Sequence, residues 1–463
     1  MYITGIKPQL VVFPCKVKMK RRHKIIINRV QTCTKNYFQE SSLHGFHYIT
    51  DQKSSKFKSY FWALVCTIST CLCFMLIRSQ FMSYYSNRIT TTIATTAFPV
   101  WEVPFPAVTI CNFNVVYKDA TIEIKELLNN RVSPLEIDNF FADLSVMVAS
   151  AKLKGDIKWH KHKKIIAILQ RMGYTTDVLM AQLAQPCAQM ISDCFWNAKQ
   201  SNCSEIFTLV KTTSGFCCSF NYKGIKTNQQ FREIYTNGVG PSFGLSVRLN
   251  AEENKYLSSI TNTYGIDVAV HENIKYPDLS IYSTTLRAGS DVSLAIIPEI
   301  IQSDENVKEI DITTRGCAFA DEIKLDWSYN YSYGTCINEC KARALTKLCG
   351  CIPYYYYPIY GKHKYCTLLD TTCVKTNHIR YKNSKIELQN HNALECNCYP
   401  QCNEISYSYR LDQELLKTSE SETKSNESVL QVYFEKVSCT KLQKSVFITW
   451  ELILGKNLVL VTV

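Results

Sequence analysis

The residues with the clearest chemistry in this sequence are its cysteines. The chain has 22 of them in 463 residues, and 17 lie between Cys111 and Cys439. Ten of these are crowded between Cys317 and Cys402. Closely spaced cysteines either pair as disulfides in an oxidising compartment or bind a metal through their sulfurs. The compartment therefore decides which chemistry applies.

Three short motifs would suit zinc, whose structural sites are tetrahedral and rich in sulfur. They are Cys336-x3-Cys340, Cys349-x-Cys351 and Cys396-x-Cys398. In a reducing cytosol these motifs would favour a metal. Because the features described next place them outside the cell, we expect disulfides there, with no metal site and no cofactor.

The sequence has no recognisable catalytic constellation. Its nine histidines are scattered, and it contains no HExxH, GxSxG or phosphate-loop motif. His271, in the run GIDVAVH, is better explained as a structural residue. We therefore expect no catalytic residues and no enzyme activity.

A membrane span is indicated by Tyr60–Ile77, YFWALVCTISTCLCFMLI, which is 18 residues without a charge. A helix of this length covers roughly 27 Å of a hydrocarbon core about 30 Å thick. A signal peptide is the first alternative, but the basic region before the run is long and no small-residue cleavage pattern follows it. A buried core helix is the second alternative, and the flanking aromatic residues favour the membrane instead.

The charges give the orientation of this span. Residues 1–56 contain eleven Lys and Arg and two acidic residues, so they carry +9 of the net charge of +12. A basic block at one end does not indicate a nucleic-acid partner, and by the positive-inside rule it lies in the cytosol. The chain after the span is then extracellular. Three glycosylation sequons, at Asn202, Asn330 and Asn426, all lie on that side.

The extracellular part is expected to be α+β, with helices attached to a mixed sheet. Residues 118–153 and 162–184 carry apolar residues at helical spacing, whereas residues 205–320 contain short β-branched and aromatic runs. The cysteine-rich stretch 336–402 is again helical in character.

Spacing alone cannot pair the ten crowded cysteines, which allow about nine hundred connectivities. One nested arrangement stands out, in which a helix over CINECKARALTKL runs antiparallel to the segment before Cys396, and no bridge crosses another. It pairs Cys351 with Cys366, Cys349 with Cys373, Cys340 with Cys396, Cys336 with Cys398 and Cys317 with Cys402. Each bridge would contribute roughly 2–4 kcal/mol, and together they would make a stiff lever.

Several motifs resemble the degenerin/epithelial sodium channel family, most closely its insect pickpocket branch. FPAVTICN resembles the signature after the family's first span and contains Phe105, Pro106, Cys111 and Asn112. LHGFHYI, with His44 and Gly45, resembles the cytosolic gating motif before that span. GFCCSFN and the block from CINEC to CNCYPQCNEISY resemble the extracellular domain, and the likeness covers residues from about 40 to 454.

The resemblance implies a subunit of a trimeric, sodium-selective, amiloride-sensitive cation channel of the plasma membrane. Family members cross the bilayer twice, form homo- or hetero-trimers with related subunits, and have a hand-like extracellular domain. That domain has a palm sheet, finger helices and a thumb stapled by disulfides. The implied mechanism is that a stimulus deforms finger and thumb, and the rigid thumb then moves the spans. The sequence does not indicate whether the stimulus is a proton, a peptide, a small ligand or force.

The resemblance also bears on single residues. The family's thumb suggests the nested pairing described above. For the remaining extracellular cysteines it implies Cys111–Cys217 and Cys194–Cys203, leaves Cys187 and Cys218 as a further pair, and leaves Cys439 over as a free thiol or a bridge to a partner. Gly45 is expected to sit where a turn or close approach leaves no room for a Cβ atom. An ordinary juxtamembrane loop is the alternative to this gating role.

The end of the sequence departs from the family pattern. The match continues to Leu454, where family members enter an apolar helix with a Gly-Gly pair and a Gly-x-Ser selectivity element. GKNLVLVTV follows here instead, so we expect no selectivity filter in this chain and a second span that is missing or truncated. A non-conducting single-pass receptor or modifying subunit is therefore the alternative to a channel subunit.

The expected domains are a basic cytosolic segment at 1–56, a transmembrane helix at 57–86, an extracellular cysteine-rich domain at 87–445 and a divergent pre-pore segment at 446–463.

Overall fold

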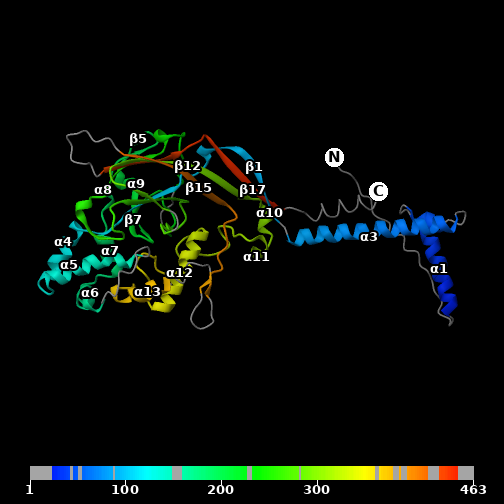
Figure 1. Ribbon diagram of the computed structural model, residues 1–463, viewed down its shortest axis with the longest axis horizontal. Coiled ribbons are helices and arrows are strands. Elements are labelled where there is room, and N and C mark those ends of the chain that lie inside the picture. The colour runs from blue at the N-terminus through cyan, green and yellow to red at the C-terminus, as the bar shows by residue number, and fades with distance from the viewer. Residues whose placement is uncertain are drawn as a thin grey trace. The chain divides into compact units, whose positions relative to one another are not determined.

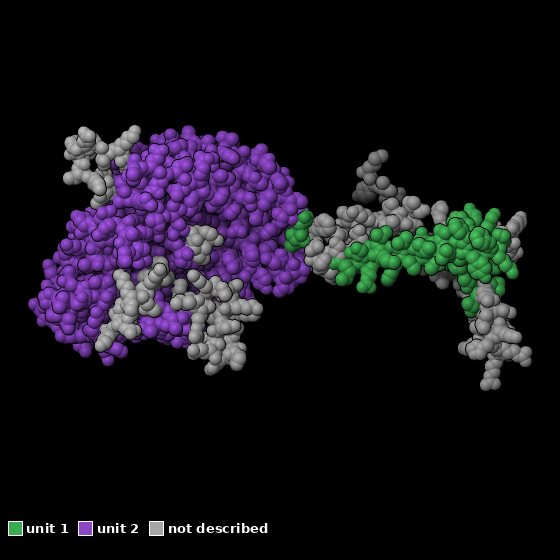
Figure 2. All heavy atoms as spheres, viewed as in Figure 1, with its two compact units in different colours: residues 1–90, 446–463 green, residues 91–445 purple. Residues whose placement is uncertain are grey.

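The computed structural model describes residues 23–41, 45–50, 55–86, 89–148, 159–226, 232–280, 283–359, 364–378, 385–386, 394–415 and 427–446. The chain forms two compact units (Figure 2). Unit 1 comprises residues 1–90 and 446–463, and unit 2 comprises residues 91–445.

The described part of unit 1 is helical. It contains α1 (His23–Glu40), α2 (Phe46–Thr50) and α3 (Lys56–Ser86). Within the described residues, the Lys56–Ser79 part of α3 is the one helix long and apolar enough to cross a membrane. Its large side chains, such as Phe57, Leu64 and Phe74, are exposed, which suits a helix surrounded by lipid.

An eight-stranded mixed sheet forms one layer of unit 2. Its strand order is β1-β17-β12-β16-β8-β4-β5, and β15 also pairs with β12. The strands are β1 (Ile89–Pro99), β4 (Ile191–Trp196), β5 (Lys199–Gln200), β8 (Leu245–Asn250), β12 (Ser290–Ser303), β15 (Glu404–Leu415), β16 (Glu427–Phe434) and β17 (Ser438–Val446). Buried and half-buried residues alternate along β16, because successive side chains point to opposite faces of a sheet.

A five-stranded antiparallel sheet packs against the first, in the order β11-β10-β2-β7-β6. Its strands are β2 (Ala107–Asn112), β6 (Phe207–Thr212), β7 (Gly215–Phe220), β10 (Ile266–His271) and β11 (Thr284–Leu286). One apolar core joins the two sheets, with Ile110 and Phe220 from the second sheet and Val247 and Leu294 from the first. Two short strand pairs add to these sheets, β3 (Asn114–Tyr117) with β9 (Tyr256–Ser259) and β13 (Lys385–Ile386) with β14 (Leu394–Glu395).

The longer helices of unit 2 form two groups that lie side by side (Figure 1). We call the first group the finger: α4 (Ile122–Asn129), α5 (Pro134–Asp143), η3 (Leu144–Met147), α6 (Lys163–Arg171) and α7 (Thr176–Leu183). We call the described residues between Cys317 and Cys402 the thumb, with α12 (Tyr333–Cys349), η7 (Leu368–Asp370) and α13 (Thr371–His378). The remaining α-helices are the single turns α8 (Cys187–Met190), α9 (Cys203–Ile206), α10 (Glu305–Lys308) and α11 (Ile312–Arg315). A second apolar core joins finger and thumb, with Phe141 and Leu169 packed together with Ala344 and Tyr355.

Local signals explain where two of these helices begin and end. The Ser133 hydroxyl accepts a hydrogen bond from the Glu136 N–H, and Pro134 occupies the first turn of α5. Ser332 caps α12 in the same way, through the Thr335 N–H. Gly350 then ends α12 in the left-handed conformation, with φ +68°.

The thumb is inserted in a crossover of the eight-stranded sheet. β12 runs parallel to both β16 and β17, and parallel neighbours require a connection that returns to the starting end of the sheet. That connection contains the thumb, and β15 comes back antiparallel along β12. The α+β class expected from the sequence is confirmed, and its mixed sheet follows from this crossover.

We predict that Gly244→Ala disrupts folding of unit 2. A Cβ atom at Gly244 would collide with the Val432 carbonyl oxygen and lie 2.9 Å from the Tyr433 Cα atom, both on the neighbouring strand β16. Overpacking of this kind costs about 1–3 kcal/mol or more, so we expect loss of surface expression and a lower Tm of the full chain. Gly334→Ala is the matched control, because its nearest neighbour would be 4.0 Å away. Equal expression of the two variants would contradict the prediction.

Candidate functional site

Phe105, in the expected signature motif, lies between the two sheets of unit 2. Its ring packs edge-on against Trp196 on β4, Phe434 on β16 and Phe220 on β7, with centroid distances of 4.7, 5.5 and 6.1 Å. The Phe105 carbonyl accepts a hydrogen bond from the Asn221 side chain at 2.5 Å. Pro106 is buried beside it. This part of the motif therefore joins the eight-stranded sheet to the five-stranded sheet.

Asn112, at the end of β2, is a buried hydrogen-bonding centre. Its Nδ2 donates to Gln185 Oε1 at 2.7 Å and to the Ala251 carbonyl at 2.9 Å. Its Oδ1 accepts from the Asn114 N–H at 2.9 Å and from the Tyr256 hydroxyl. Asn112, Gln185, Ala251 and Asn114 are buried and Tyr256 is half-buried, so the amide satisfies donors and acceptors that would otherwise be unpaired.

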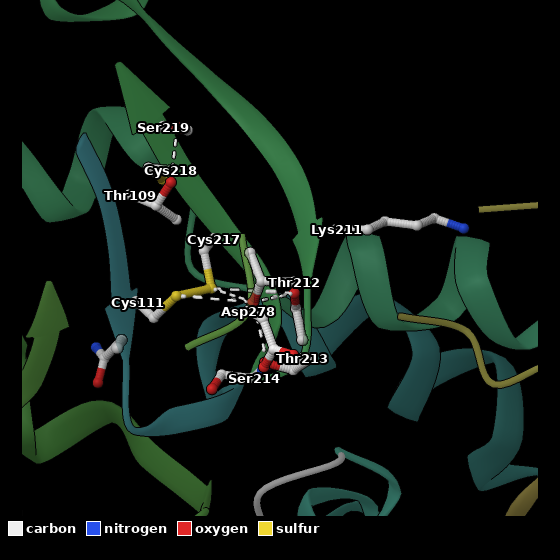
Figure 3. Close-up of a disulfide and its surroundings, with 12 residues drawn as sticks. Thr109, Cys111, Lys211, Thr212, Thr213, Ser214, Cys217, Cys218, Ser219 and Asp278 are labelled. Atoms are coloured by element: carbon white, nitrogen blue, oxygen red, sulfur yellow. Dashed lines mark hydrogen bonds between the residues drawn. A yellow bond between two sulfur atoms is a disulfide. The ribbon is translucent and has the colours of Figure 1, made fainter. Parts of the chain in front are cut away.

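Cys111, the remaining signature residue, bonds to Cys217 on β7, and the two Cα atoms are 4.7 Å apart. The Thr212 hydroxyl lies 3.1 Å from Cys217 Sγ at the turn that follows β6 (Figure 3). Seven further disulfides are formed among the residues that the structure describes. They are Cys187–Cys218, Cys194–Cys203, Cys317–Cys402, Cys336–Cys398, Cys340–Cys396, Cys349–Cys373 and Cys351–Cys366. These eight bonds join the same pairs that were expected from the sequence.

The thumb bonds follow the antiparallel arrangement described above. Cys336 and Cys340 lie one helical turn apart on α12 and both are buried. Cys439, which the expected pairing left over, is a buried free thiol on β17. Its burial raises the pKa of the thiol, so Cys439 is a core residue of the sheet in this chain.

A buried ion pair attaches α12 to the sheets. Asp278 lies beside the turn between β6 and β7, where its Oδ1 accepts hydrogen bonds from the Thr213 hydroxyl at 3.1 Å and the Ser280 N–H at 3.2 Å (Figure 3). Asp278 Oδ2 is 3.6 Å from Lys341 Nζ, and the two side chains are 8% and 16% exposed. Removing one partner of such a pair would leave a buried charge uncompensated.

A second charged contact joins three parts of unit 2. Lys211, at the end of β6, lies 3.5 Å from the Asp177 carboxylate on α7 and donates to the Tyr365 hydroxyl of the thumb at 3.1 Å. Burial lowers the pKa of Lys211, and the Asp177 charge opposes this effect. The lysine thereby connects the five-stranded sheet, the finger and the thumb.

His271 is half-buried at the end of β10. Its Nδ1 lies 2.9 Å from the Glu272 carbonyl and its Nε2 lies 2.8 Å from the Thr109 hydroxyl. Burial lowers the pKa of His271 to about 4, so the ring is neutral at physiological pH. The carbonyl can only accept, so Nδ1 carries the proton and Nε2 accepts from Thr109. The contacts give His271 a structural place in the sheet.

The expected gating glycine lies in unit 1, against the apolar helix α3. Gly45 has φ +91°, and a Cβ atom there would be 2.7 Å from Cys66 Sγ and 3.6 Å from the Trp62 ring. The ring of Tyr48, in the short helix α2, stacks on the ring of Trp62 with a centroid distance of 4.8 Å. The Ser59 hydroxyl donates to the Ile49 carbonyl. We call this arrangement the glycine seat. His44, the other half of the motif, lies outside the described residues.

The three sequons can now be placed in part. Asn202 caps α9 through the Ser204 N–H and is exposed, as is Asn330 just before α12. Asn426 lies outside the described residues. Both described asparagines are accessible positions for a glycan, and their modification stays a prediction.

These features coincide with one known family along most of the chain. Residues 37–456 match the model of the family described as amiloride-sensitive sodium channel. This chain belongs to that family. The match includes the glycine seat, the apolar helix α3 and all of unit 2, so the degenerin/epithelial sodium channel resemblance expected from the sequence is confirmed. It is a family of ion channels, not of enzymes.

Several similar curated members of the sodium channel family are insect proteins. The chain is 25% identical over 385 residues to the sodium channel protein Nach of Drosophila ananassae, covering 81% of this chain and 71% of that protein. It is 25% identical over 408 residues to pickpocket protein 28 of Drosophila melanogaster, covering 80% and 63%. It is 26% identical over 432 residues to pickpocket protein 11 of the same species, covering 90% and 70%.

Some contacts of this family member had no signal in the sequence. The Asp278–Lys341 and Lys211–Asp177 pairs join residues that are distant along the chain and fall in no motif. Whether a charged side chain is buried can be judged only once its neighbours in the fold are known. The signature residues, by contrast, were identified through the family resemblance, which also implied Cys217 as the partner of Cys111 but gave no partners for Phe105 and Asn112.

We predict that Asn112→Ala destabilises unit 2 by about 2–4 kcal/mol, because it leaves several buried donors and acceptors without partners. The measurement is the Tm of the full chain in detergent, together with its surface expression. Asn129→Ala, at the exposed end of α4, should change stability by less than about 0.5 kcal/mol. A Tm for Asn112→Ala equal to that of Asn129→Ala would show that the hydrogen-bonding centre contributes little.

Proposed function

We propose that this chain is a subunit of a trimeric, sodium-selective cation channel that amiloride blocks and that the extracellular unit gates. The family match over residues 37–456 carries the proposal. In this arrangement residues 1–56 are cytosolic, residues 57–86 cross the bilayer, and residues 87–445 are extracellular and glycosylated at Asn202, Asn330 and Asn426. Residues 446–463 lead from β17 toward the membrane.

The contacts of unit 2 suggest how a stimulus travels. The thumb is stiffened by five disulfides, of which Cys317–Cys402 closes its base, and the Asp278–Lys341 pair joins it to the sheets. A displacement of α12 therefore moves the base of the thumb, because the thumb does not bend internally. β12 pairs with β17, and β17 is a neighbour of β1. The chain leaves this strand pair at β1 toward α3 and at β17 toward residue 446, so strand movement reaches both ends of the extracellular unit.

The first test is expression of the full chain in oocytes, alone and together with a related subunit. We expect a whole-cell inward current that amiloride blocks and that falls when external sodium is replaced by a large organic cation. Surface biotinylation of the same cells is the control for delivery to the membrane. Surface protein with no amiloride-sensitive current in either setting, and no change in the partner's current, would contradict a channel subunit and favour a non-conducting receptor.

The second test concerns the glycine seat, which we propose has to be intact for the pore to open. Gly45→Ser should lower the open probability by about tenfold, because a left-handed backbone costs an ordinary residue roughly 1–2 kcal/mol. The new side chain would also meet Cys66. Single-channel recording measures the effect, and surface expression should be unchanged.

Two further variants separate the clash from the backbone strain. Gly173→Ser places the same residue at φ +88° with no atom within 4 Å, so it should leave gating unchanged. Cys66→Ala combined with Gly45→Ser removes the sulfur that the new side chain meets, and we expect partial recovery of the open probability. Normal gating in Gly45→Ser alone would rule out a role for the seat.

A further inference from the structure

A strip of basic side chains lies on the exposed side of the finger. Residues 159–176 contain four Lys and Arg and no acidic residue, whereas the whole chain after residue 56 carries only the remaining +3 of the net charge of +12. The four are Lys161 in the turn η4 (Trp159–His162) and Lys163, Lys164 and Arg171 in α6. All four side chains are exposed, and we call them the basic ridge. Figure 1 shows α6 at an edge of unit 2.

The fold of the finger holds this ridge in place. Three apolar side chains of α6 are buried in the finger, and helical spacing puts Lys163, Lys164 and Arg171 on the opposite side. Lys164 and Arg171 are two helical turns apart, which is roughly 10 Å along the axis. Before the helix, His162 is buried and its Nε2 lies 2.8 Å from Asp143 Oδ2 on α5. The ridge is therefore a surface of the folded finger.

Most of the charge on the ridge is not neutralised. Lys161 Nζ lies 3.1 Å from the Asp143 carboxylate, but Lys163, Lys164 and Arg171 have no ion pair with any of the residues that the structure describes. The first turn of a helix favours acidic side chains, and that of α6 has none. Two lysines in that turn make the helix less stable, so folding does not explain them. A local rule broken at an exposed surface points to a binding role.

The position of the ridge indicates the kind of partner. None of its side chains lines either cavity at the junction of finger and thumb, so the charges face an open surface and do not enclose a small ligand. A row of cations on an open surface suits a polyanion that binds along it. Outside a cell, the polyanions that keep their charge at every physiological pH are sulfated sugar chains, because sulfate esters stay ionised.

We propose that the basic ridge binds a sulfated glycosaminoglycan of the heparan sulfate class. The inference goes beyond the channel proposal and rests only on its extracellular placement of unit 2. The buried side of α6 contributes Ile166 and Leu169 to a cavity of about 30 Å³, which Thr367 and Leu368 of the thumb also line. A sugar chain held on the ridge therefore acts on a helix that packs against the thumb.

The first test measures the binding of fluorescent heparin to intact cells that express the full chain and make no heparan sulfate of their own. Desulfated heparin of the same length is the reference, and surface biotinylation corrects for expression. Replacing Lys163, Lys164 and Arg171 together by Gln should weaken heparin binding about tenfold, because three exposed ionic contacts are lost. The change should leave folding intact, since all three side chains are exposed. Lys163→Arg with Lys164→Arg keeps the charge and should keep the binding.

The matched control replaces Lys199, Lys324 and Arg287 by Gln. These side chains are also exposed and lie on β5, in the thumb and between β11 and β12, so the same charge is removed away from the ridge. Heparin binding should be unchanged in this control. Unchanged binding in the ridge variant, an equal loss in the control, or equal binding of desulfated heparin would each overturn the proposal. Tighter binding to phosphatidylserine vesicles than to heparin would do so as well, and would assign the ridge to a lipid surface.

A heparin column separates this proposal from the membrane topology. Purified full chains in detergent all contain the basic residues 1–56, so any difference between the variants comes from unit 2. The ridge variant should elute at a lower NaCl concentration than the control variant. Elution of the two variants at the same NaCl concentration would show that the ridge binds no heparin. Current is measured in neither experiment, so the ridge and the channel proposal can fail separately.

Discussion

The parallel alignment of β16 and β17 with β12 is the constraint on which the rest of unit 2 depends. Parallel neighbours cannot be joined by a tight turn, so the chain has to run back along the sheet before β16, and β15 does so antiparallel to β12. The thumb is inserted where the chain turns from β12 into β15. Cys317 and Cys402 close it at its base, with Cα atoms 5.0 Å apart. The buried Arg315 stiffens the same point, because its guanidinium donates to the carbonyls of Ile310 and Cys317.

The signature strand β2 has a different role from that of a ligand site. It lies between β7 and β10 and is buried along its whole length. Phe105 before it joins the two sheets, and Asn112 at its end joins it to residues near the finger. Such a strand transmits movement because it cannot deform. The family signature is therefore a mechanical requirement of this fold, while movement has to occur at less densely bonded places.

The features that could be predicted are those that a short stretch of sequence determines. The apolar run in α3 has no charge over 18 residues, and lipid is the solvent that such a run requires. Cys336 and Cys340 are spaced for one helix face, which limits the ways in which the thumb cysteines can pair. The left-handed backbone at Gly45 was similarly suggested by the residue type.

The remaining features depend on contacts between distant segments. The partners of Asn112 come from Gln185, Ala251 and Tyr256, and no local pattern indicates that these residues meet. The contact of Gly45 with Cys66 requires the chain before the span to fold back on α3. The small cavity between Met147 of η3 and Val374 of α13 exists only because this part of the finger lies against α13 of the thumb. Packing of this kind is a property of the tertiary structure.

The distribution of strong and weak contacts locates the flexible joint. The thumb is covalently stapled within itself, and the buried Asp278–Lys341 pair connects it to the loop that follows β10. Separating such a pair leaves a charge in an apolar interior, so thumb and sheets move together. The junction of finger and thumb instead contains cavities of about 30 and 10 Å³. Missing packing contacts lower the cost of relative movement there. If the extracellular unit gates the channel as we propose, a stimulus therefore has most effect at the junction of finger and thumb.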